Sequence, residues 1–503
     1  MFKPLLISLA LCSCATVKPS GVHEDFAARP ATVTTDFDKL FTGMTLRLDF
    51  EHTKEHPDPA FAATLGVGQQ RPDGDSIRNW KLRAEREWPG SRTQLIDPSN
   101  FGKYFVEVRD HKTRTLLFSR GFCSIYGEWE TTAEAKTASN SYAECVRFPE
   151  PRKPFDLDIL KRSEDGGFQS IAAGYFDATA NVDRRPIETR GEIVTLFENG
   201  DAAHHVDLLI AGDGYSKEQR DKFVGDAKRL VEVLFDTEPY RRRKSDFNVR
   251  VLFLPTPMNT SGIGNPRAGI SRDTNFGLSY NAFGSDRYVL AMHDTELREI
   301  CAQSPYDAVI LVFNERKYGG GGIYNLWATV AADTEPAPYV FVHEFGHSFA
   351  GLADEYYSSQ VAYEDFIKPG CEPWEPNVTA LLDPAKLKWK DLVAAGTPLP
   401  TPWGQKEFDE IDLAYQKRRA EMLEAKASEA EVEALFREVK STTGPLLAKE
   451  KFAGKVGAFE GASYQAKGLY RPEPDCIMFT RNPTRFCKVC ERAIDRTIDT
   501  FVR

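Results

Sequence analysis

Hydrophobic and polar residues alternate, at least in part, along two stretches of the first third of the chain, as they do in half-buried β-strands. These stretches are 44–50 and 104–109, and a short apolar run at 115–118 follows them after turn-rich residues. A small β-sandwich over residues 43–150 is therefore predicted. A proline cluster at 149–154 marks its end, and residues 151–190 are predicted to be a linker with another pair of strands.

The second half of the chain has a different pattern, in which buried-strand runs at 206–212, 247–254 and 307–313 alternate with helix-favouring segments. Ser216 and Gln219 can form a capping box for the first helix. Residues 191–503 are thus predicted to form an α/β domain.

A charged stretch at about 405–440 is predicted to be a helical hairpin inserted in this domain, with Ser428 and Glu431 as a second capping box. The hairpin is either a solvated insertion, which runs of charge usually indicate, or a lid or partner site.

The composition excludes one class of partner. With 41% hydrophobic and 12% aromatic residues, the chain of 503 residues has an ordinary globular content. Its formal net charge of -10 argues against nucleic acid, because phosphate binding depends on clustered Lys and Arg. No pattern predicts an oligomeric state.

The N-terminus has the features of an export signal. Lys3 precedes an apolar run at 5–11 that is too short to span a bilayer. Leu11-Cys12-Ser13-Cys14 resembles the bacterial lipobox, which predicts a lipoprotein-type signal peptide at 1–14, lipid on Cys14 and a tether at 15–42. The alternative is a plain cleaved signal. Either predicts an exported protein, and lipidation would anchor it to a bacterial membrane or cell surface.

Export would allow the cysteines to form disulfide bonds, because thiols can pair in an oxidising compartment. Seven cysteines remain after the leader, so at least one has no partner within the chain. Cys123 and Cys145 are the simplest pair to propose. Near the C-terminus disulfides are also predicted, although Cys487 and Cys490 have the spacing of a metal or redox pair.

The most specific motif is His343-Glu344-Phe345-Gly346-His347, which has the spacing of a zinc hydrolase site. Residues four apart share a helix face, so the two histidines can ligate one Zn²⁺ ion. Glu344 then lies beside the metal, where it can take a proton from a zinc-bound water. A catalytic zinc usually has three protein ligands, and Asp354 is the first choice for the third. Gly351 would end the helix and let the chain turn back.

The stretch 343–357 resembles the signature of the bacterial IgA-peptidase-type zinc metallopeptidases. Weaker similarities to that family occur at 127–129, 146–149, 212–215, 318–325, 459–462, 470–472, 476–478 and 486–490, so the resemblance covers most of residues 43–503. It implies an α+β fold, with an N-terminal β-sandwich followed by a zincin-type α/β metallopeptidase domain. Cys476-Ile477-Met478 is also similar to the Met-turn of metzincins. Met478 would then be the hydrophobic floor under the metal, the alternative being an ordinary core position.

One difference from metzincin-like chains concerns the third ligand. Those chains place glycine three and the ligand six residues after the second histidine, whereas Gly351 and Asp354 stand four and seven residues after His347. Glu355 and, more remotely, Glu460 are therefore rivals to Asp354.

The substrate contacts have weaker signals. Residues 326–331 are either an edge strand that pairs with an extended peptide or an ordinary central strand. Tyr464 and Tyr470 are candidates to stabilise an oxyanion, and each could equally be a packed core residue.

Together these features predict an exported zinc endopeptidase that acts on a protein or peptide, with Glu344 first as base and then as proton donor. Two alternatives stay open: a lipid-anchored surface binding protein with a vestigial metal site, and a zinc hydrolase of non-peptide bonds.

Overall fold

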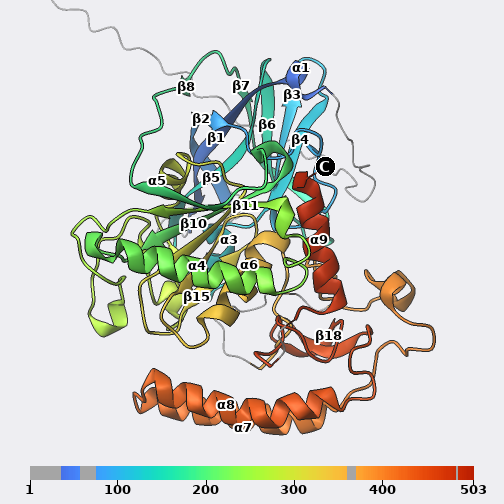
Figure 1. Cartoon of the computed structure of the whole chain (residues 1–503). Coiled ribbons are helices and arrows are strands. Elements are labelled where there is room, and N and C mark those ends of the chain that lie inside the picture. The colour runs from blue at the N-terminus through green and yellow to red at the C-terminus, as the bar shows by residue number, and fades with distance from the viewer. Residues whose placement is uncertain (1–35, 57–74, 359–366, 368–369, 483–484, 503) are drawn as a thin grey trace, which may run out of the picture.

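The computed structural model describes residues 36–56, 75–358, 367, 370–482 and 485–502 (Figure 1). Cys14, the predicted signal peptide and most of the predicted tether lie outside these residues. Within the described ranges, no helix combines the length and the apolar character needed to cross a bilayer. The fold is α+β, with two four-stranded sheets in the N-terminal part and a six-stranded sheet with helices in the C-terminal part.

The N-terminal part is a sandwich of two sheets, seen at the top of Figure 1. Its sheets share one core, and Leu46, Leu48 and Phe50 are fully or almost fully buried there because alternate residues of a strand face the same side. The first sheet has the order β5 (Asn140–Pro151), β1 (Phe41–Lys54), β2 (Asp75–Glu87) and β8 (Val182–Asp183). The second has the order β4 (Leu116–Phe122), β3 (Tyr104–Asp110), β6 (Phe155–Arg162) and β7 (Phe168–Phe176). Short helices α1 (Phe37–Leu40) and α3 (Ile125–Trp129) flank them.

The sandwich continues past the boundary predicted at residue 150. Strand β6 pairs antiparallel with β3 along the whole of β3, and β7 pairs with β6. Leu157 and Ile159 of β6 are buried in the same core as Val106 of β3. The segment predicted as a linker therefore supplies two strands of one sheet, and their partner β3 lies too far back in the sequence for a local pattern to reveal the pairing.

The C-terminal part is built on a six-stranded mixed sheet. The order is β15 (Gly320–Ile323), β16 (Trp327–Ala331), β14 (Ala308–Phe313), β10 (Val206–Asp213), β11 (Phe247–Phe253) and β9 (Glu192–Phe197). The four inner strands are parallel, and the edge strands β15 and β9 are antiparallel to their neighbours. Two small hairpins add β12 (Leu278–Ser279) with β13 (Leu290–Ala291), and β17 (Phe459–Ala462) with β18 (Gln465–Arg471).

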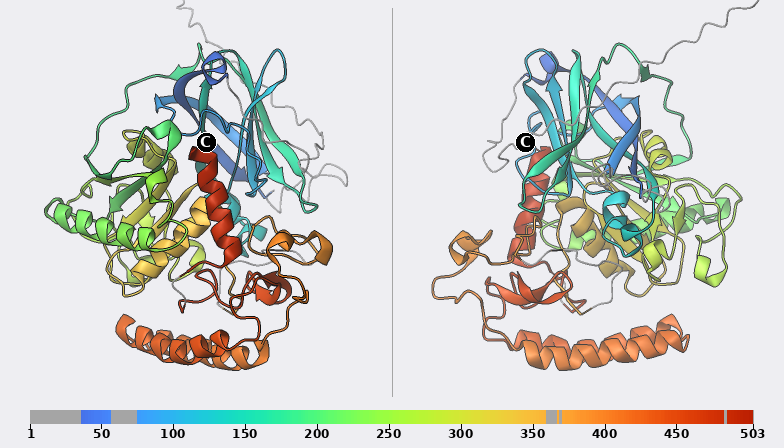
Figure 2. Two further views of the ribbon diagram at one scale, coloured as in Figure 1. Left: turned by 45° about the vertical axis from the view of Figure 1, so that its right-hand side comes forward. Right: turned by 180° about the vertical axis from the view of Figure 1, so that it is seen from behind.

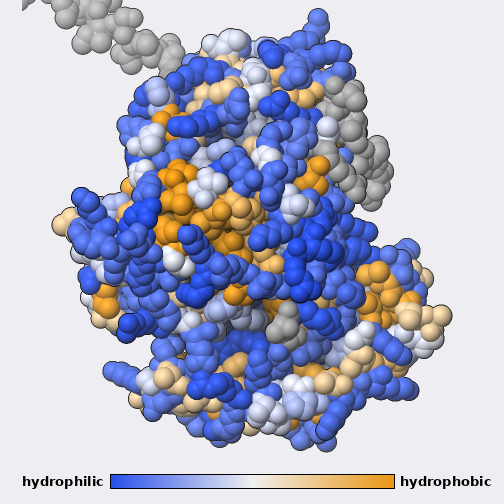
Figure 3. Space-filling model, in the orientation of Figure 1, coloured by the Kyte–Doolittle hydropathy of each residue, from blue (hydrophilic) through white to orange (hydrophobic). Residues whose placement is uncertain are grey.

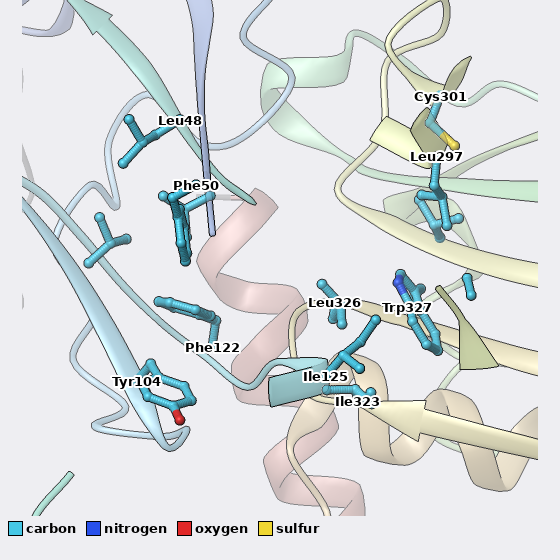
Figure 4. Packing of buried hydrophobic residues seen from close by; sticks show 14 of the residues in the cluster. Leu48, Phe50, Tyr104, Phe122, Ile125, Leu297, Cys301, Ile323, Leu326 and Trp327 are labelled. Carbon is cyan, nitrogen blue, oxygen red and sulfur yellow. The ribbon is translucent and has the colours of Figure 1, made fainter. Parts of the chain in front are cut away.

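Both faces of the six-stranded sheet are buried, which explains the continuous apolar runs of its inner strands. Along β10, Leu209 and Ala211 belong to the core shared with the sandwich, whereas Leu208 and Ile210 belong to the core on the other face. Figure 4 shows the shared core: sandwich residues such as Phe50 and Phe122 lie on one side, and Leu326 and Trp327 on the other. The sandwich thus helps to cover a face that helices cover in many α/β sheets.

Helices cover the opposite face. Helix α4 (Arg220–Asp236) begins after the capping box that Ser216 and Gln219 form, and packs against α6 (Ala337–Ala350). Helix α9 (Lys488–Val502) packs on α6 and ends with Phe501 against Arg120 of the sandwich, whereas α5 (Asp294–Cys301) belongs to the shared core. On the face in Figure 3, hydrophilic residues predominate, and hydrophobic ones gather between α4 and the sandwich.

The charged stretch forms the predicted hairpin, with α7 (Gln405–Glu424) and α8 (Glu429–Ala448) lying antiparallel at the bottom of Figures 1 and 2. Ser428 and Glu431 form the predicted capping box at the start of α8. The hairpin is tied to the body by Arg437, which pairs with Glu335, and by Arg481, which pairs with Glu433.

The predicted disulfides are wrong, because all seven cysteines among the described residues are free thiols. Cys123 accepts a hydrogen bond from the Lys103 amide at 3.4 Å, whereas the Cys145 thiol contacts Asp294 Oδ2 at 3.0 Å. Cys145 lies in β5 of one sheet, and Cys123 directly follows β4 of the other sheet. Each has its own partner, so closeness in the sequence did not make them a pair.

A buried charge cluster joins the sandwich to the C-terminal part. The Arg47 side chain of β1 is 2% exposed, and its guanidinium donates to Glu85 Oε1 at 2.9 Å and to Glu299 Oε2 at 3.1 Å. Glu299 belongs to α5, and it also accepts from Arg83 of β2. Removing one member of such a cluster leaves the remaining buried charges less well compensated, so the arginine helps to fix how the two parts dock.

We expect Arg47→Met to lower the free energy of unfolding by about 3 kcal/mol, measured by urea denaturation, because Asp49, Glu85 and Glu299 all lose the buried guanidinium that they share. Arg78→Met is the matched control. Arg78 pairs with Glu55 at the surface, with side chains 48% and 52% exposed, and its loss should cost less than about 1 kcal/mol. Equal effects of the two substitutions would contradict a structural role for the buried cluster.

Candidate metal centre

Helix α6 presents the two histidines of the sequence motif side by side. The Nε2 atoms of His343 and His347 are 3.1 Å apart. Each Nδ1 atom lies against a backbone carbonyl, that of Ile477 at 3.1 Å for His343 and that of Leu352 at 2.5 Å for His347. A ring nitrogen in contact with a carbonyl oxygen carries the hydrogen, so in the neutral rings both Nε2 atoms keep a lone pair that points into the site.

Asp354 joins the two histidines. Its Oδ1 atom lies 3.0 Å from Nε2 of His343 and 3.3 Å from Nε2 of His347. The turn at Gly351 makes this possible: its φ of 62° is left-handed, and the Leu352 and Gly351 amides donate back to the carbonyls of Gly346 and His347. The bond from the Gly351 amide to the His347 carbonyl is that of an αL helix end, which stops the helix and reverses the chain.

The rivals of Asp354 lie elsewhere. Glu355, the next residue, is directed into a cluster of cysteines, where its Oε1 atom is 3.2 Å from the Cys490 thiol. Glu460 lies on β17 and pairs with Lys467 at 2.9 Å. A helix that continued past Gly351 could not have brought Asp354 back to His343. In the reversed chain, the side chains of Asp354 and Glu355 point to opposite sides.

The three facing atoms fit a divalent cation. Two lone-pair nitrogens and a carboxylate oxygen converge in a site where His343 and Asp354 are 5% and 7% exposed. Although burial disfavours its charged form, the contact with Asp354 raises the pKa of His347 to about 9. The site thus attracts positive charge, and two imidazoles with one carboxylate are a zinc ligand set that leaves a fourth position open.

Met478 lies beneath the motif. It is fully buried, and a Cβ atom added to Gly346 would come within 3.2 Å of its Sδ atom. The carbonyl of the preceding Ile477 accepts from His343, and the carbonyl of Met478 accepts from the Glu355 amide at 2.8 Å. The turn that carries Met478 therefore holds the metal helix and the segment after it together.

Glu344 lies on α6 between the two histidines and lines the same cleft as they do. Burial raises the pKa of its carboxyl above the ordinary value, and the charges of the two histidines and, less strongly, of Arg287 oppose this rise. A carboxylate that binds a proton more readily is a better general base near neutral pH.

The two candidate tyrosines differ in position. The Tyr464 hydroxyl donates to Asp354 Oδ2 and lines the cleft. Tyr470 lies on β18, where its backbone pairs with Thr379, and it is not among the residues that line the cleft. Tyr464 is thus in a position to orient the third ligand, whereas Tyr470 belongs to the small sheet.

A cleft of ≈ 1070 Å³ runs past the metal centre. Its walls include β15, α6 and the α7–α8 hairpin, so the inserted hairpin faces the site. Of the two alternatives for residues 326–331, the ordinary central strand is correct, because β16 lies between β15 and β14, and the edge is β15. A Cβ atom on Gly322 would lie 2.5 Å from the Glu344 carbonyl, which shows why the edge strand is rich in glycine.

Several groups of the site carried no signal in the sequence. Arg287 lines the cleft, and its charge interacts with Asp354 and Glu344. The Tyr339 hydroxyl donates to the Ile477 carbonyl at 2.9 Å, beside His343 Nδ1. Every residue has a backbone carbonyl, and Arg287 belongs to no motif. Only the fold therefore identifies these groups as part of the site.

Two family models match the chain. The one described as IgA Peptidase M64 matches residues 194–498, more than half of the chain, and the one described as Peptidase M64 N-terminus matches residues 70–172. These matches confirm the resemblance seen in the sequence. No curated protein matches the chain.

We expect Tyr464→Phe to weaken Zn²⁺ binding by roughly 10–100-fold, because Asp354 loses the hydroxyl that orients it. Competition against a chelator of known affinity measures this effect. Tyr470→Phe is the matched control, because it removes a tyrosine hydroxyl from the β17–β18 hairpin, and it should leave the Zn²⁺ affinity unchanged. If Tyr464→Phe keeps full metal affinity and loses only turnover, Tyr464 acts on the substrate instead.

Proposed function

We propose that this chain, which belongs to the IgA peptidase M64 family of metallopeptidases, is an exported zinc-dependent endopeptidase of protein substrates. One observation supports the zinc dependence above all: the Nε2 atoms of His343 and His347 and the Oδ1 atom of Asp354 lie 3.0–3.3 Å from one another, with lone pairs facing inward. A vestigial metal site would have lost at least one of these groups.

In this proposal His343, His347 and Asp354 hold the metal, and the cleft leaves room for a water and a substrate carbonyl at the open position. A bound Zn²⁺ ion supplies Lewis-acid chemistry, which acidifies the water and polarises the carbonyl. The carbonyls of Ile477 and Leu352 keep both histidines in the tautomer that ligation needs.

Glu344 moves the protons. Its carboxylate takes a proton from the attacking water as the new C–O bond forms. It then gives that proton to the leaving nitrogen as the C–N bond breaks, so the products are a carboxylic acid and a free amine. The positive charge of Arg287, in the same cleft, is suited to stabilise the oxyanion that develops on the carbonyl oxygen.

The substrate is proposed to bind as an extended strand. Strand β15 is at the edge of the six-stranded sheet and lines the cleft beside α6. Its first residue, Gly320, already pairs with residues 287 and 289, and a peptide can add to the rest of the strand through main-chain hydrogen bonds. Gly320 and Gly322 let this strand lie against the helix that bears Glu344 and His347. The α7–α8 hairpin forms part of the facing wall, so it is suited to contact the substrate.

Export and anchoring rest on the sequence alone. Residues 1–14 have the pattern of a lipoprotein signal, and Cys14 is proposed as the lipidated residue on the outer face of a bacterial membrane. The long N-terminal stretch before β1 would then separate the folded body from the membrane.

We expect Glu344→Gln to lower hydrolysis by roughly 10²–10⁴-fold while the metal content stays unchanged, because it removes a proton acceptor and no ligand. Mass spectrometry of the peptides released from a mixed panel of unfolded proteins, with and without a chelator, measures the loss. Glu192→Gln, at an exposed position on the far edge strand β9, should keep full activity. Undiminished, chelator-sensitive proteolysis by Glu344→Gln would reject this role for Glu344.

A further inference from the structure

A second cluster of potential metal ligands lies next to the catalytic centre. Glu355, Cys476, Cys487 and Cys490 are all fully buried, and one ligand atom from each lies within 4.8 Å of the others. We propose that these four residues bind a structural Zn²⁺ ion, distinct from the ion that His343, His347 and Asp354 would hold.

The distances fit a tetrahedral metal site better than a disulfide. The Sγ atoms of Cys476 and Cys490 are 3.9 Å apart, whereas a disulfide needs about 2.05 Å. Ligands that each lie about 2.3 Å from a tetrahedral zinc are separated by about 3.8 Å. Glu355 Oε1 lies 3.2 Å from the Cys490 sulfur and 3.8 Å from the Cys487 sulfur, so the carboxylate completes the fourth corner.

The surroundings of the cluster supply donors to the sulfurs, as they do around structural zinc. The Cys487 and Met478 amides donate to the Cys476 sulfur at 3.2 and 3.5 Å. The Cys490 amide donates to the Cys487 sulfur at 3.4 Å, where α9 begins. Amide donors and the positive end of a helix both stabilise a thiolate, which is the form that binds metal.

Glu355 has an unsatisfied oxygen at this site. Its Oε1 atom accepts from the Asn377 amide at 3.0 Å, but its fully buried Oε2 atom has no hydrogen-bond partner among the described residues. A charged carboxylate that is fully buried and only partly hydrogen-bonded is costly, and a cation held by Oε1 would lower the cost of its charge. A hydrogen bond from a neutral thiol would be a weak substitute.

The charges around the cluster also favour a metal. Arg471, which is fully buried, interacts electrostatically with Glu355, and Arg485 with Cys476 and Cys487. Zn²⁺ would neutralise half of the charge of three thiolates and a carboxylate, and these arginines help to offset the rest.

The proposed ion would fasten three segments that hold the catalytic centre. Glu355 directly follows Asp354, and Cys476 precedes Ile477, whose carbonyl accepts from His343. Cys487 directly precedes α9 and Cys490 lies in its first turn, and α9 packs on the metal helix α6. The second site therefore sets the position of the third catalytic ligand and of the Met478 turn without touching substrate.

The test compares the wild-type full chain with a variant in which both histidine ligands of the catalytic centre are replaced. We expect the wild-type protein, purified without chelator, to contain two zinc ions per chain by elemental analysis and native mass spectrometry. The His343→Ala/His347→Ala variant should keep one. The zinc K-edge absorption fine structure of this variant should show sulfur neighbours at about 2.3 Å together with one oxygen.

Two further variants separate the site from general effects of cysteine loss. Cys490→Ser should lose one zinc ion and lower the Tm. Cys301→Ser, at a fully buried cysteine of α5 outside the cluster, should keep both ions even if its Tm falls. If Cys490→Ser does not fold, the zinc content and spectrum of the His343→Ala/His347→Ala variant still decide the question.

Two results would overturn the second site: no zinc in the His343→Ala/His347→Ala variant, or a disulfide among Cys476, Cys487 and Cys490 after alkylation and peptide mapping without reductant. The outcome is independent of the proposed function. Sulfur-bound zinc in a protein that hydrolyses no peptide supports the second site and not the endopeptidase. A single histidine-bound zinc with normal proteolysis supports the endopeptidase and not the second site.

Discussion

Three lone-pair atoms that converge on one point are the constraint on which this structure depends. The Nε2 atoms of His343 and His347 and the Oδ1 atom of Asp354 repel one another unless a proton or a metal ion lies among them. The fold holds them there by anchoring the other side of each ring to a backbone carbonyl and by reversing the chain at Gly351. The packing around the site thus offsets the repulsion among these three atoms.

That packing comes from elements that are distant in sequence. Helix α6 packs on strands β15 and β16 of the six-stranded sheet and on helices α4 and α9, and its apolar residues belong to the core on that face. The other face of the sheet is covered partly by the sandwich, through a core that runs without a break from β1 to Trp327. The sandwich therefore supports the sheet from which the metal helix is positioned, as well as forming its own domain.

The proposed structural zinc site would extend this support. Asp354 and Glu355 are neighbours whose side chains enter two different clusters, so movement at one cluster is transmitted to the other through a single peptide bond. Cys476 and Met478 are related in the same way, since their turn serves the cysteine cluster on one side and the metal helix on the other. Loss of the cysteine cluster would thus reach the catalytic ligands without any direct contact.

The sequence by itself determined what depends on local periodicity and spacing. The inner strands of the large sheet, both capping boxes and the helical hairpin follow from patterns within a few residues, and His343, Glu344 and His347 follow from their spacing on one helix. Gly351 could be identified as the turning point because only a residue that tolerates positive φ can reverse the chain there.

Tertiary structure decided what depends on contacts between distant segments. It paired β6 with β3 and so extended the sandwich, and it placed β16 inside the sheet. It also directed Glu355 toward Cys476, Cys487 and Cys490, where the sequence had suggested disulfides. A residue's type limits the bonds it can make, but its partner is chosen by the packing of segments that the sequence separates by many residues.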